Sequence, residues 1–182
     1  MLWRFRGWCK TQPKAVAKFL LSVPWGEPLV SMEVYSLLQQ WVDIEPIDAL
    51  ELLNHNFPDK FVREFAVYYL QRLSADELQQ VLLQLVQALK HEYNHDSMLA
   101  RFLIIKAVFN QTQLGHYFFW LMKACLSKVS PYRERYAVVL EVYLRFCGRF
   151  RQDLKCQCFL YNKLTEVRAI FIVRLLPRAN GV

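Results

Sequence analysis

Residues 91–95 read His-Glu-Tyr-Asn-His, which matches the H-E-x-x-H motif of zinc-dependent hydrolases. In those enzymes a helix places the two histidines one turn apart so that both bind zinc, while the glutamate polarises the metal-bound water. His91, Glu92 and His95 are therefore the first residues to consider for chemistry in this chain.

The surrounding segment does not favour a zinc site. Asn94 tends to stop a helix, so we expect the motif to lie where a helix ends, with its histidines on no common helical face. The longer form of the motif needs a glycine and a histidine at positions where this chain has Met98 and Arg101. We interpret the match as accidental, and we predict that its three residues are exposed or capping residues of a turn between two stacked helices.

Other reactive residues are not arranged as a site. Cys156 and Cys158 are too closely spaced to share a helical face, and the chain contains neither a glycine-rich phosphate loop nor a G-x-S-x-G motif. His116 follows Gly115 in an aromatic run that includes Trp120, and we interpret it as a buried, hydrogen-bonded, structural histidine. We predict no catalytic residue, no cofactor and no metal ion.

The composition indicates one helix-rich domain. Apolar residues make up 54% of the 182 residues and aromatic residues 15%, whereas the chain has only five glycines. The longest apolar runs are too short to span a membrane, and no signal peptide is apparent. The five cysteines have no disulfide-framework spacing, which favours reduced thiols in a cytoplasmic protein.

The net charge of +7 is concentrated at the two ends. Residues 1–18 carry five basic and no acidic residues, residues 19–144 carry ten basic and fourteen acidic, and residues 145–182 carry eight basic and two acidic. A nucleic-acid-binding domain more usually has a basic stripe across its folded body. We therefore expect no nucleic-acid partner, and no direct insertion into a membrane.

Helical periodicity runs through most of the chain, and no stretch shows sustained strand alternation. Short connections between helices of this length predict antiparallel neighbours. The expected helices cover residues 13–22, 29–41, 46–55, 59–72, 74–90, 96–110, 112–128 and 131–147, with a weaker one at 150–167.

Two features predict that these helices stack as repeats. The segment PKAVAKFLLS (13–22) recurs in similar form as PIDALELLNH (46–55), and residues 58–67 resemble the HEAT-repeat signature P-D-x-x-V-R-x-x-A-V. In this signature Asp59 would cap the helix and pair with Arg63 for about 0.3 kcal/mol, while the small Ala66 would let a neighbouring helix approach. The predicted fold is all-α, a HEAT/armadillo-like right-handed α-solenoid of antiparallel helix pairs.

Several longer stretches carry a more specific resemblance. The segments LWRFRGWC, ALELLNHNFPDKFVREFAVYYLQRLSADEL, LGHYFFWLM and ERYAVVLEVYLRFCG occur in this order. Together they resemble the helical accessory (PIK) domain of phosphatidylinositol 3-kinase catalytic subunits, most closely class I, with class II as the runner-up. The predicted division is a PIK helical domain at 1–148, a connector helix toward a kinase domain at 149–167, and a tail without family resemblance at 168–182.

This resemblance implies a scaffold rather than an enzyme. In the family, phosphate transfer from ATP to the inositol 3-hydroxyl belongs to a kinase domain, whose phosphate-binding lysine, catalytic base and metal-binding acids are not recognisable here. We expect a fragment without activity of its own, whose partners are the other domains of the catalytic subunit and a regulatory subunit. It would be cytoplasmic and reach membranes through the full-length enzyme. The alternative is a free-standing HEAT-like protein-interaction adaptor.

Overall fold

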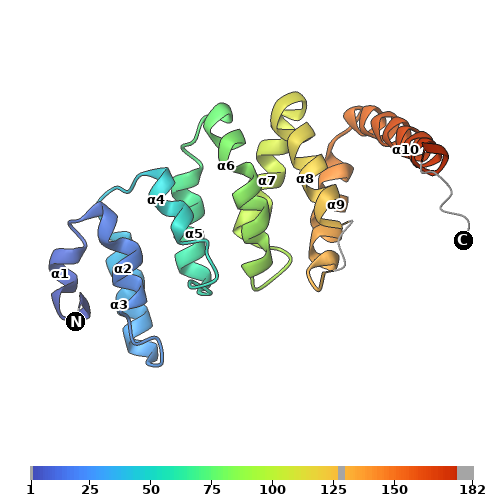
Figure 1. The fold of residues 1–182 in the computed structure, drawn as a ribbon. Coiled ribbons are helices and arrows are strands. Elements are labelled where there is room, and N and C mark those ends of the chain that lie inside the picture. Colours follow the sequence, from blue (N-terminus) through green and yellow to red (C-terminus); the bar gives the residue numbers. More distant parts are fainter. Residues whose placement is uncertain (1, 127–129, 176–182) are drawn as a thin grey trace, which may run out of the picture. The chain divides into compact units, whose positions relative to one another are not determined.

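The fold consists of helices in two compact units, Met1–Tyr143 and Leu144–Val182 (Figure 1). The computed structural model describes residues 2–126 and 130–175, and all of its regular elements there are helical, which confirms the all-α prediction. In these two stretches no helix is both long and apolar enough to cross a lipid bilayer.

The helices follow the chain in short steps. In the first unit they are η1 (Leu2–Phe5), α1 (Arg6–Cys9), η2 (Pro13–Ala15), α2 (Val16–Leu21), α3 (Pro28–Gln39), α4 (Pro46–Glu51), α5 (Lys60–Leu70), α6 (Ala75–Ala88), η3 (Leu89–His91), α7 (Met98–Phe109), η4 (Gln111–Gly115), α8 (His116–Leu126) and the greater part of α9 (Arg133–Phe146). The second unit contains α10 (Phe150–Leu175).

Local sequence signals set many of the helix starts. Pro28 and Pro46 occupy the first position of α3 and α4, where the missing N–H has no intrahelical partner to lose. The predicted cap of α5 is present, because the Asp59 carboxylate accepts a hydrogen bond from the Val62 backbone N–H at 3.0 Å. Ser74 forms a capping box at the start of α6.

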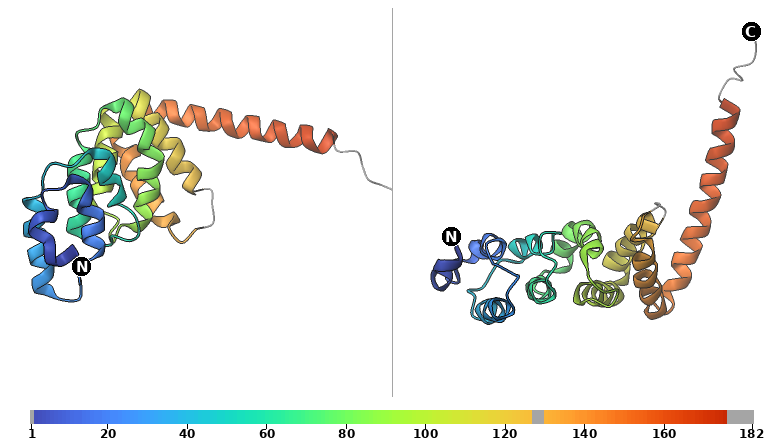
Figure 2. Two further views of the ribbon diagram at one scale, coloured as in Figure 1. Left: turned by 60° about the vertical axis from the view of Figure 1, so that its left-hand side comes forward. Right: turned by 90° about the horizontal axis from the view of Figure 1, so that it is seen from below.

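Within the first unit the helices pack in two rows. Helices α3, α5 and α7 contact one another in succession, α6 contacts α8, and α4 pairs with α5. In the right-hand view of Figure 2, α3, α5 and α7 lie in one row, and α4, α6 and α8 in another. The core lies between the rows, where Val62 and Leu70 of α5 and Leu85 of α6 are fully buried. Each such side chain contributes about 1.5–3 kcal/mol to the free energy of unfolding.

Three elements differ from the sequence-based expectation. The helical segment Leu2–Cys9 was not predicted, and a π-helical turn, η4, opens the predicted helix at 112–128. Helix α10 extends to Leu175, past the predicted end of the connector at residue 167. Of the predicted tail, residues 176–182 lie outside the described residues.

Candidate functional site

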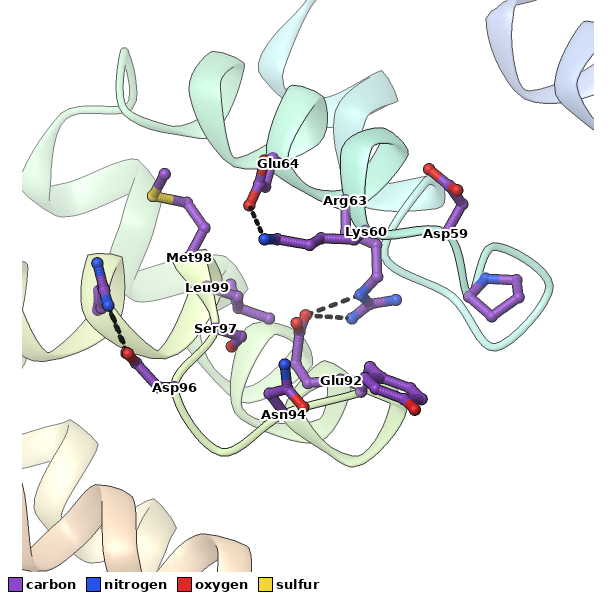
Figure 3. A pocket seen from close by; sticks show the side chains of 13 residues that line it. Asp59, Lys60, Arg63, Glu64, Glu92, Asn94, Asp96, Ser97, Met98 and Leu99 are labelled. Carbon is purple, nitrogen blue, oxygen red and sulfur yellow. Dashed lines mark hydrogen bonds and ion pairs between the residues drawn. The ribbon is translucent and has the colours of Figure 1, made fainter. Parts of the chain in front are cut away.

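A buried ion pair between Arg63 and Glu92 is the centre of the most distinctive site in the first unit. Arg63 lies on α5, and Glu92 follows η3, so the two residues are 29 positions apart in the chain. The Glu92 carboxylate accepts from Arg63 Nε at 2.8 Å and lies 2.6 Å from Arg63 Nη2. Only 4% and 8% of the two side chains are exposed, so both charges are largely shielded from bulk water. Figure 3 shows the guanidinium and the carboxylate pointing toward one another.

The remaining donors of Arg63 bind backbone carbonyls from two other segments. Nη1 donates to the Leu53 carbonyl oxygen at 2.9 Å, and Nη2 donates to the Ala88 carbonyl oxygen at 3.1 Å. Leu53 lies just beyond α4, and Ala88 is the last residue of α6. Two longer bonds reach Asn54 and Phe57 in the loop before α5. One guanidinium therefore ties α4, α5 and the end of α6 together, and we call this set of bonds the Arg63 clasp.

Helix α9 also binds the end of α6. Arg135 Nη1 donates to the carbonyls of Leu89 and Lys90, each at 2.9 Å, and the Tyr136 hydroxyl donates to the Val86 carbonyl at 3.2 Å. These acceptors lie in the last turn of α6 and in η3, where helix carbonyls run short of backbone donors. Cations placed there also interact favourably with the helix dipole.

The zinc-like motif begins at this end of α6, where η3 closes. Its first histidine closes η3 at His91, and the backbone of Glu92 is already extended, with φ −71° and ψ 140°. His95 lies in the exposed loop before Ser97, whose side chain caps α7. The two histidines are therefore not one turn apart on a helix. Among residues 2–126 and 130–175, no group of three or more His, Cys, Asp or Glu side chains is arranged to hold a metal ion.

The predictions for Glu92 and Arg63 were wrong in one respect each. Glu92 is not exposed to solvent but buried, because Arg63 binds it. Arg63 does not pair with Asp59. The second oxygen of Asp59 instead accepts from the Tyr35 hydroxyl at 2.7 Å. Burial, followed by the hydrogen bond to this carboxylate and its negative charge, raises the pKa of Tyr35 to about 12.

His91 lies beside the clasp in a cationic environment. Its ring centroid is 5.9 Å from that of His55, and it is half-buried. Burial lowers the pKa of His91, and the positive charge of Arg63, followed by that of His55, lowers it further. Lys90 and Arg135 act in the same direction. A proton on this histidine is therefore disfavoured by every charged group that contributes to its pKa.

A cavity of about 360 Å³ opens over the clasp, between the start of α5 and the loop that leads into α7. Its wall carries two further ion pairs, Lys60 with Glu64 at 3.7 Å and Asp96 with Arg101. With the clasp and the capping carboxylate of Asp59, every charged side chain that lines the cavity already has a partner. The arrangement holds helices together and leaves no poised acid, base or nucleophile.

The other predicted structural residues mark close packing. Ala66 is fully buried on α5. Gly115 lies where a Cβ atom would be 2.5 Å from the Tyr143 hydroxyl oxygen and 2.6 Å from the Ala107 carbonyl oxygen, so only glycine fits without a shift. His116 is half-buried rather than fully buried, and its Nε2 accepts from Trp120 Nε1 at 3.1 Å.

Comparisons with known proteins cover the same region. Residues 1–155 match the phosphoinositide 3-kinase family accessory domain (PIK domain). The chain is 45% identical over 166 residues to phosphatidylinositol 3-kinase 1 of Dictyostelium discoideum, with 91% of this chain and 10% of the relative covered. It is 42% identical over 154 residues to phosphatidylinositol 3-kinase 2 of the same organism, with 85% and 8% covered.

A human relative has a similar identity to this chain over a similar length. The chain is 41% identical over 167 residues to the phosphatidylinositol 4-phosphate 3-kinase C2 domain-containing subunit beta of Homo sapiens, with 91% of this chain and 10% of the relative covered. The chain thus spans about a tenth of the length of the curated relatives it matches. Since the accessory-domain match extends over most of its length, the chain belongs to the phosphoinositide 3-kinase PIK-domain family.

Proposed function

We propose that this chain is the helical scaffold of a phosphoinositide 3-kinase catalytic subunit and performs no phosphoryl transfer itself. The observation that carries the proposal is the Arg63 clasp, in which the buried charges of the candidate site connect α4, α5 and α6. Charged groups that catalyse phosphoryl transfer must be free to contact ATP, metal ions and the acceptor hydroxyl. In this chain the two buried charged groups of the candidate site, Arg63 and Glu92, instead bind one another, and Arg63 also binds backbone carbonyls at helix ends.

The proposed architecture of the scaffold is a HEAT/armadillo-like, right-handed α-solenoid. Support comes from the two rows of helices in the first unit, in which α3 contacts α5, α5 contacts α7, and α6 contacts α8. In such repeats each helix pair buries its apolar face mainly against the next pair. A clasp that crosses from α5 to the end of α6 would fix the angle between successive pairs.

The proposed partners are the other domains of the same catalytic subunit, together with a regulatory subunit. The row α3–α5–α7 exposes large apolar side chains, among them Met32, Phe61, Tyr68 and Ile105, each more than half exposed. Large apolar side chains that gather on a surface are typical of protein-interaction sites. The proposed location is the cytoplasm, with recruitment to membranes through the full-length enzyme.

A lipid-kinase assay on the purified chain tests the absence of activity. The chain would be incubated with ATP, Mg²⁺ and phosphatidylinositol vesicles, and 3-phosphorylated lipid would be measured. We expect no product above a protein-free control, with phosphatidylinositol 3-kinase 1 of D. discoideum as the positive control. Product formation that survives further purification would refute the proposal.

A further inference from the structure

The first helical segment turns an apolar stripe away from the core. Leu2, Phe5 and Trp8 recur every three residues along η1 and α1, and they are 38%, 58% and 64% exposed. The inner side of the segment is marked by Trp3, whose ring stacks on that of Phe19 of α2 at a centroid distance of 5.8 Å. Phe5 and Trp8 are therefore mostly exposed, whereas Leu2 is partly covered.

Basic residues lie on the same segment and on the helices that follow it, and an acid that reaches the segment is bound by an arginine. Residues 1–18 contain no aspartate or glutamate. Glu33 of α3 reaches the segment but is bound by Arg6. Arg4, Lys14 and Lys18 are exposed and form no ion pair with any described residue. These three cations lie on η1, η2 and α2, and α1 contacts both η1 and α2. We call them, together with Leu2, Phe5 and Trp8, the N-terminal face.

The chemistry of the N-terminal face fits the surface of an acidic bilayer. Tryptophan, phenylalanine and leucine favour the boundary between headgroups and acyl chains, and neighbouring lysine or arginine residues bind anionic headgroups. A single-stranded nucleic acid would stack its bases on flat aromatic rings. The exposed Leu2, and Leu21 of α2 at 57% exposed, offer aliphatic surface that suits acyl chains better than bases.

We propose that the N-terminal face binds acidic lipid bilayers peripherally, with Leu2, Phe5 and Trp8 at the level of the headgroups and Arg4, Lys14 and Lys18 against anionic lipid. This contact differs from insertion of a helix. It adds a second role to the scaffold and does not depend on the scaffold function. Each cation near an anionic surface strengthens binding about fivefold, so the three together account for about a hundredfold.

Vesicle co-sedimentation of the full chain tests the proposal. Vesicles of phosphatidylcholine alone are compared with vesicles that also contain phosphatidylserine, at low and at physiological ionic strength. We expect binding only to the vesicles with phosphatidylserine, and weaker binding at the higher salt concentration because exposed charges are screened. Equal binding to neutral vesicles, or no binding to acidic ones, would overturn the proposal.

Matched variants locate the contact. The triple variant Arg4→Gln, Lys14→Gln, Lys18→Gln should weaken binding about a hundredfold, whereas Arg149→Gln, Arg151→Gln, Lys155→Gln removes the same charge from exposed positions elsewhere and should change binding much less. An equal loss in both would show attraction to net charge alone and would overturn the assignment.

The aromatic contribution is tested in the same way. Phe5→Ala with Trp8→Ala should reduce vesicle binding, whereas Tyr93→Ala with Phe109→Ala, at positions 88% and 86% exposed, should not. All four residues are exposed, and unchanged circular dichroism would show that the variants fold. Binding to polyuridylate or polyglutamate that is tighter than binding to acidic vesicles would identify a different class of partner and refute the lipid assignment.

Discussion

The Arg63 clasp should be the most sensitive electrostatic feature of the first unit. Removal of one partner from a buried ion pair leaves an uncompensated charge in a poorly solvated place, which typically costs about 3–5 kcal/mol. In Glu92→Ala, Arg63 keeps its carbonyl acceptors on Leu53 and Ala88, so we expect a loss near 3 kcal/mol. In Arg63→Ala those carbonyls also lose their donor, and the loss should approach 5 kcal/mol.

A double-mutant cycle separates the pair from its surroundings. Arg63→Met and Glu92→Leu would be made singly and together. The double variant removes both charges and fills much of their volume, so its loss of stability should be clearly smaller than the sum of the losses in these two single variants. The free energy of unfolding would be measured by urea denaturation followed by circular dichroism. A control, Lys60→Met, removes an exposed cation at the same helix start and should change stability by less than about 1 kcal/mol. Additive single effects, or a loss below about 1 kcal/mol for Arg63→Ala, would refute the description of the clasp.

Three further predictions concern the same unit. Gly115→Ala should cost about 1–3 kcal/mol of stability because its Cβ collides with the Tyr143 hydroxyl and a backbone carbonyl, whereas Gly26→Ala, in open space, should be nearly neutral by thermal unfolding. Ser97→Ala removes the cap of α7 and should cost about 1 kcal/mol in urea denaturation. His91 has a lowered pKa when folded, so the unfolded chain binds more protons; stability should fall as the pH drops below about 6.5, and less so in His91→Gln. A pH dependence unchanged by His91→Gln would contradict the assigned environment.

Local features of the fold could be predicted from the sequence because their signals lie within a few residues. The cap at Asp59 and the capping box at Ser74 depend on contacts three residues away, and both are present. The end of the helix near His91 was likewise indicated by the polar residues that follow it. Gly115 was predicted to be a structural residue, but the two oxygens that lie close to the position of its missing Cβ could not be predicted from the sequence.

Contacts between distant segments could not be predicted in this way. The partner of Arg63 is 29 residues away, and nothing near Glu92 distinguishes a buried carboxylate from a solvated one. The signature at residues 58–67 suggested the nearest acid, Asp59, as the partner of Arg63. Tyr35 takes that carboxylate instead. Helical periodicity also did not reveal the segment Leu2–Cys9, because it is too short for a repeating pattern.

Replacement of the matching segment in phosphatidylinositol 3-kinase 1 of D. discoideum by this chain tests the scaffold function most directly. The two are 45% identical over 166 residues, so the exchange preserves much of the sequence. The measurement is the rate at which the purified chimera forms 3-phosphorylated phosphatidylinositol. The scaffold proposal predicts an active chimera whose activity is lost with Arg63→Ala and retained with Lys60→Met. A folded chimera without activity, or full activity with Arg63→Ala, would contradict it.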